Sequence, residues 1–80
     1  MTELEQKIYN AFLIKKPEFD KAFNSFDNLE GEYLDFPFVM DGGIFNYVRY
    51  DVATGKPNRI KYPYYVNDSL DSEYRYLDLI

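Results

Sequence analysis

Residues 33–51 read YLDFPFVMDGGIFNYVRYD, and this stretch decides the fold. Apolar residues occupy every second position over 34–40, which is the two-residue period of a strand with one buried face. Residues 41–43 form an Asp-Gly-Gly hairpin turn signal, and β-branched and aromatic residues fill the return run over 44–51. The stretch therefore predicts an antiparallel hairpin. Pro37 cannot donate to a strand ladder, so we expect its amide position to face a sheet edge or a bulge.

The thirty residues before the hairpin have a helical period instead. Thr2 and Glu5 have the spacing of a capping box at a helix start. Two apolar stripes follow, made of Leu4, Ile8, Ala11 and Phe12, and then of Phe19, Ala22, Phe23 and Phe26. Both stripes are typical of helix faces that pack in a core. Pro17 separates them, so we predict a helical pair that ends at Asn28 or Gly31, with one helix bent at Pro17 as the alternative.

The residues after the hairpin predict further strands. A loop over 53–58 leads to a third strand from Arg59 to Val66, interrupted at Pro63. Residues 73–80 favour a fourth strand because of their tyrosines and terminal Ile, although a short helix capped at Asp68 or Ser69 fits too. We therefore predict one α+β domain over residues 1–80. In this two-layer fold the helical pair (1–30) packs on one face of a three- or four-stranded antiparallel sheet (33–80), and the other face stays uncovered.

The composition excludes most catalytic chemistry. The chain has no Cys and no His, which removes Ser-His-Asp and Cys-His catalysis, zinc fingers and disulfides. Oxygen-bearing side chains cluster over 67–73, but without the spacing or glycine of a calcium loop, so a turn is the simpler interpretation. We expect a protein that is not an enzyme and holds no metal or cofactor. No apolar run reaches the roughly 18 residues of a membrane span, and no signal peptide is visible, so we expect a cytoplasmic protein without membrane contact.

Charge and tyrosine content point to a binding surface. The net charge is −5, and residues 22–48 contain five acids and no base. Carboxylates can occupy sites that Arg and Lys build for phosphates, so this acidic segment fits a partner that normally binds nucleic acid. All seven Phe lie at or before position 45, whereas eight of nine Tyr lie at or after position 33. This division predicts that Phe fills the core while Tyr occupies the open sheet face and its rim.

We therefore expect a non-enzymatic protein that docks on a basic protein partner, such as a nuclease or a nucleic-acid-guided complex, and inhibits it without binding nucleic acid directly. The expected electrostatic contacts are Glu30, Glu32, Asp35 and Asp41, and the expected aromatic anchors are Tyr62, Tyr64, Tyr65, Tyr74 and Tyr76. In overall composition the chain resembles the small acidic inhibitors that phages and mobile elements encode against host nucleases and nucleic-acid-guided defence complexes. One way in which it could inhibit such a partner is to stand in for nucleic acid. That resemblance covers no aligned stretch and transfers no residue.

Two alternatives stay open. The tyrosines can be half-buried scaffolding, and the uncovered sheet face can pair with its own copy, which would make the protein an adaptor or a homodimeric assembly subunit.

Alternatively, basic residues interleave with aromatic ones between Tyr47 and Tyr62, namely Arg49, Lys56, Arg59 and Lys61. That pattern is typical of proteins that hold single-stranded nucleic acid by base stacking, although the acidity of the whole chain opposes it.

Overall fold

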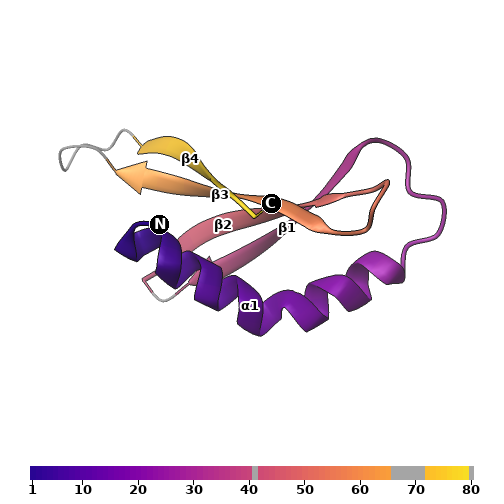
Figure 1. Ribbon diagram of the computed structural model, residues 1–80, viewed down its shortest axis with the longest axis horizontal. Helices are drawn as coiled ribbons and strands as arrows, with labels where there is room; N and C mark the ends of the chain where they lie inside the picture. Colours follow the sequence, from indigo (N-terminus) through magenta and orange to yellow (C-terminus); the bar gives the residue numbers. More distant parts are fainter. Residues whose placement is uncertain (41, 66–71, 80) are drawn as a thin grey trace.

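The fold is one helix packed on a four-stranded antiparallel sheet (Figure 1). A computed structural model describes residues 1–40, 42–65 and 72–79. The helix is α1 (Glu3–Asn24), and the strands are β1 (Tyr33–Met40), β2 (Ile44–Asp51), β3 (Pro57–Tyr65) and β4 (Ser72–Asp78). The strands lie in chain order as a meander, with every neighbouring pair antiparallel. The two-layer α+β prediction is confirmed, and the C-terminal segment is a strand rather than a helix.

The predicted helical pair is wrong, because a single helix runs through Pro17. Proline lacks the amide that would bond to the carbonyl of Leu13 and its ring crowds that carbonyl. Both side chains are exposed, so this part of the helix faces solvent and the released carbonyl can bond to water. The helix bends near its middle and follows the sheet (Figure 1).

The two ends of α1 are set by local hydrogen bonds. At its start, the Glu5 amide donates to the Thr2 hydroxyl at 3.1 Å, and the Thr2 amide donates to Glu5 Oε1 at 3.0 Å. This is the predicted capping box. At its end, Ser25 is the C-cap, and its amide donates to carbonyls of the last turn. The helix therefore stops before the predicted Asn28 or Gly31.

The apolar side of α1 packs against one face of the sheet and forms the core. The buried helix residues are Ile8, Phe12 and Phe19, and the buried sheet residues that meet them are Phe38, Val48, Tyr50, Ile60, Tyr62 and Leu77. The rings of Phe12 and Phe19 stack at 6.3 Å between centroids. Because each buried ring removes roughly 150–250 Å² from water, a few rings hold a domain that has no disulfide.

The predicted division between Phe and Tyr is wrong at several positions. Tyr50 and Tyr62 are buried in the core, whereas Phe45 and Phe26 are about half exposed. A buried tyrosine needs a partner for its hydroxyl. Tyr50 has one, because its hydroxyl donates to Asp20 Oδ1 at 2.6 Å.

Of the three strand prolines, Pro57 begins β3, and Pro37 and Pro63 lie where a strand lacks one neighbour. β1 is an edge strand, as Pro37 predicted. In β3, the paired positions with β2 run only to Lys61 opposite Tyr47, whereas Pro63 still pairs with Tyr74 of β4. The missing amide of Pro63 therefore costs no bond to β2. The β3–β4 arm (62–65 and 72–75) projects beyond the end of the shared ladder (Figure 1).

Candidate functional site: the open face of the sheet

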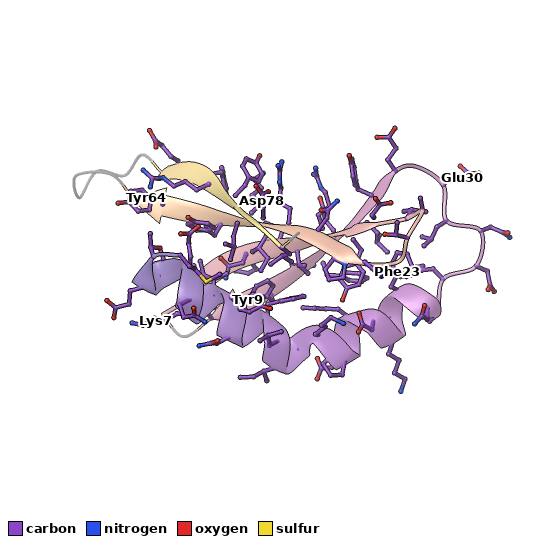
Figure 2. All side chains as sticks on the ribbon, viewed as in Figure 1. Lys7, Tyr9, Phe23, Glu30, Tyr64 and Asp78 are labelled. Atoms are coloured by element: carbon purple, nitrogen blue, oxygen red, sulfur yellow. The ribbon has the colours of Figure 1, made fainter. Side chains whose placement is uncertain are left out.

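The sheet face that points away from α1 carries the candidate site. Its side chains rise from the strands on the side opposite the helix (Figure 2). Paired residues on neighbouring strands share a face, so strand pairing defines this open face. Its members are Tyr33, Asp35, Pro37 and Val39 of β1, Phe45, Tyr47, Arg49 and Asp51 of β2, Arg59, Lys61 and Pro63 of β3, and Tyr74, Tyr76 and Asp78 of β4.

One end of the open face is apolar. Val39 lies opposite Phe45, and their side chains are 46% and 55% exposed. Pro37 lies opposite Tyr47. On the same face, Pro63 of β3 lies opposite Tyr74 of the other edge strand, β4, and Tyr74 is 55% exposed. Large apolar side chains with about half of their surface in water are costly to leave uncovered, and such patches mark interaction sites.

The middle of the open face is charged and organised by strand register. Arg49 lies directly opposite Arg59, and Lys61 follows two residues along β3. Each arginine has a carboxylate on its outer side. Arg49 Nε donates to Asp35 Oδ1 at 3.1 Å, and Arg59 Nε donates to Asp78 Oδ1 at 3.1 Å. The hydrogen bond with Asp35 raises the pKa of Arg49, so its charge is permanent.

Aromatic rings hold these cations in place. Arg49 lies over Tyr33 at 4.6 Å from the ring centroid, and Arg59 lies over Tyr76 at 4.8 Å. Lys61 Nζ lies 4.3 Å from the centroid of Tyr74. Such cation–π contacts contribute about 0.5–1 kcal/mol each at exposed sites, so they fix the orientation of the side chains more than they add stability.

The three described carboxylates among the four predicted contacts do not form one patch. Glu30 and Glu32 are exposed in the loop between α1 and β1. Asp35 lies on the open face and is paired with Arg49. Asp41 lies outside the described residues. The described acidic side chains, which are close together in the sequence, are therefore divided between a loop and an ion pair.

The five predicted tyrosine anchors also divide. Tyr74 and Tyr76 are exposed on the open face. Tyr62 is buried against α1, and Tyr64 is half-buried on the same side, with Arg75 3.6 Å above its ring centroid. The side chain of Tyr65 lies outside the described part. Tyr64 and Glu30 lie at opposite ends of the molecule (Figure 2), so the predicted residues do not make one site.

The basic and aromatic residues weighed for nucleic-acid binding are brought together more closely. Tyr47, Arg49, Arg59 and Lys61 all lie on the open face. Lys56 is exposed in the β2–β3 turn, and Tyr50 and Tyr62 belong to the core.

The sequence analysis does not name Tyr33, Val39 and Phe45 as site residues, although the strand pattern contains a signal for their place on the open face. If Leu34 to Met40 face the core at even positions, the odd positions of the same strand face outward. Odd positions of β1 pair with odd positions of β2, so the hairpin turn carries the same parity to Phe45.

Other kinds of site find little support in the described residues. Within residues 1–40, 42–65 and 72–79, no group of three or more acidic side chains is placed to hold a metal ion. α1 is too polar to cross a membrane. In comparisons with known proteins, no family model, no curated protein and no solved structure matches the chain.

Proposed function

We propose that the protein is a non-enzymatic binding protein that docks a partner protein on the open face of its sheet. The observation that supports this most is the exposed apolar end of that face, where Val39, Phe45 and Tyr74 are each about half in water. Tyr and Arg are enriched at protein interfaces because they offer large, rigid contact area. The open face is built from both, next to an apolar patch.

A protein partner fits the charges better than nucleic acid does. Three cations on the open face (Arg49, Arg59, Lys61) are balanced by three carboxylates (Asp35, Asp51, Asp78). The face is therefore neutral overall, while the chain has a net charge of −5. A polyanion would be repelled at long range by this net charge.

The preferred partner carries basic groups across the open face from the apolar patch it buries. The loop with Glu30 and Glu32 leads directly into Tyr33, so it lies at the end of the open face opposite the apolar end. Together with the net charge, this loop attracts a basic surface and raises the rate of encounter. If that surface normally receives nucleic acid, docking blocks it, and the protein acts as an inhibitor of a nuclease or a nucleic-acid-guided complex.

The test is capture of the partner with matched surface variants. The docking variant is Phe45→Ser with Tyr74→Ser, and the control is Leu13→Ser with Ile14→Ser on the exposed side of α1. Each variant is immobilised and exposed to lysate of the source organism, and retained proteins are identified by mass spectrometry. We expect at least one basic protein to be retained by the wild type and the control but reduced about tenfold or more by the docking variant.

Two results would argue against this function. Loss of the same proteins from both variants would mean that the open face is not the docking surface. Retention of every protein by the docking variant, with its fold intact by circular dichroism, would mean that the apolar end has no binding role. Inhibition is tested separately, by asking whether the purified partner loses nucleic-acid binding when the protein is added.

A further inference from the structure

A small hollow in the middle of the open face concentrates positive charge. It has a volume of about 190 Å³, and its lining includes Arg49, Arg59 and Lys61. Asp35, Tyr47 and Tyr76 complete the lining. Three cations therefore face one carboxylate at this point, on a molecule whose net charge is −5. The hollow is smaller than the roughly 300–1,000 Å³ of sites for drug-sized ligands, so it suits a single functional group.

The register makes this arrangement unfavourable for the sheet alone. Like charges directly opposite each other on neighbouring strands are destabilising, and Arg49 and Arg59 are such a pair. Lys61 adds a third positive charge on the same face. Asp35 and Asp78 offset the repulsion only from the two outer sides, because they belong to β1 and β4. Local arrangements that oppose stability occur where function requires them.

Donor groups remain available toward the hollow. Arg49 uses Nε and Nη2 for Asp35, and Arg59 uses only Nε for Asp78. Among residues 1–40, 42–65 and 72–79, no carboxylate accepts a hydrogen bond from Lys61 or from the Nη groups of Arg59. Guanidinium groups bind carboxylates and phosphates through two parallel N–H donors, so unused Nη groups favour an oxyanion ligand.

We propose that this hollow is an oxyanion subsite, which receives an acidic side chain of the docked partner protein. The proposal rests on the proposed function and adds a specific contact to it. The apolar end of the open face buries the partner's apolar patch. The cations of the hollow pair with one oxyanion of the partner, which lies at a fixed distance from that apolar patch. A carboxylate and a phosphorylated side chain share this chemistry.

The test uses small probes on the intact protein and follows the guanidinium Nε–H resonances by NMR. The probes are a blocked Gly-Glu-Gly peptide, a blocked Gly-phosphoserine-Gly peptide and a thymidine octanucleotide. The hollow variant is Arg59→Gln with Lys61→Gln. The control is Lys56→Gln with Arg75→Gln, which removes the same charge from the turn and from the other side of the sheet. Both variants should fold, since Lys56 and Arg75 are exposed and Arg59 and Lys61 are only half-buried.

We expect saturable shifts of the Arg49 and Arg59 resonances with at least one peptide, at a Kd on the order of 1 mM because a single charged group binds. The hollow variant should weaken this binding about tenfold or more, and the control less than about twofold. The peptide that binds more tightly identifies the oxyanion as a carboxylate or a phosphate group.

Three results would overturn the proposal. The first is the absence of a saturable shift with either peptide, and the second is equal weakening of peptide binding by the hollow and control variants. The third is octanucleotide binding that is about tenfold tighter than that of either peptide and is lost in the hollow variant. The last result would assign the open face to single-stranded nucleic acid. Partner capture separates this proposal from docking itself. If Phe45→Ser with Tyr74→Ser loses the partner while the hollow variant keeps it with unchanged affinity, docking stands and the subsite falls.

Discussion

The hydroxyl of Tyr50 ties the helix to the sheet through a polar contact. It donates to Asp20 Oδ1 at 2.6 Å, and Lys16 Nζ lies 2.8 Å from the other carboxylate oxygen. The Tyr50 ring is fully buried between Phe23 and Phe36. Burial and the bond to Asp20 raise the pKa of Tyr50, so it remains a donor. Burial also raises the pKa of Asp20, but hydrogen bonds from Lys16 and Tyr50 outweigh it and hold that pKa below the usual value of an aspartate.

This network predicts a pH-dependent effect of Tyr50→Phe. A carboxylate with a lowered folded-state pKa contributes stability that is present above its unfolded pKa and lost as the pH falls through the folded value. At pH 7 we expect Tyr50→Phe to lower the free energy of unfolding by about 1–3 kcal/mol, because a bond to a charged acceptor is lost. As the pH falls through the lowered pKa of Asp20, the difference from wild type should shrink. Urea unfolding at pH 7 and at a series of acidic pH values measures this trend.

The matched control is Tyr33→Phe, which removes a hydroxyl from an exposed ring with no hydrogen bond among the described residues. It should change stability by less than about 0.5 kcal/mol at every pH of the series. A difference for Tyr50→Phe that stays constant as the pH falls through the whole series would show that the charge of Asp20 does not strengthen this bond.

Among the elements, the strands were easier to predict from the sequence than the continuation of one helix through Pro17. Alternation over Leu34–Met40 and the Gly-Gly turn set the first hairpin, because a register slip would turn its apolar residues to solvent. The helix depends on which side Pro17 faces. Residues 17 and 13 lie one turn apart, so their exposure together decides whether the lost bond is tolerated. That exposure follows from packing against the sheet, which local sequence does not specify.

Pro17→Ala tests the cost of this helix-breaking residue. Restoring the amide allows a bond to the carbonyl of Leu13, and alanine has the highest helix propensity. Proline offsets part of this by restricting the unfolded chain, worth about 0.4–1 kcal/mol. We expect Pro17→Ala to raise the free energy of unfolding by about 1–2 kcal/mol, measured by urea unfolding. Lower stability would instead mean that the bend is required for Phe12 and Phe19 to pack on the same sheet.

The candidate site shows why neighbouring acids in sequence can be misleading. Glu32 and Asp35 are three residues apart, yet one lies in a loop and the other pairs with Arg49, fourteen residues further along the chain. Strand pairing brings such distant residues together, and the register that does so depends on turn geometry. Strand parity was sufficient to predict that Tyr33 and Phe45 share the open face. The position of Arg49 directly opposite Arg59 could be known only from the observed β2–β3 register.

At the scale of the whole molecule, charge and apolar surface are separated. The open face combines a neutral charge balance with exposed rings, and the net charge of −5 is carried by the rest of the chain. Under the proposed function, the net charge would attract a basic partner at a distance, and apolar burial would hold it at contact. The first effect weakens with salt, whereas the second does not. This separation favours a different protein over a second copy, because two copies repel each other.

The oligomeric state follows from the same features. Edge-to-edge pairing is hindered because Pro37 interrupts the free edge of β1, and charged Glu73, Arg75 and Asp78 lie along β4. Face-to-face pairing would bring together two acidic molecules. We therefore expect a monomer in sedimentation velocity from about 5 to about 500 µM at physiological salt. A dimer in this range that Phe45→Ser with Tyr74→Ser abolishes, and Leu13→Ser with Ile14→Ser leaves intact, would make the open face a homodimer interface. The bound partner would then be a second copy of this chain, and the inhibitor function would fall with it.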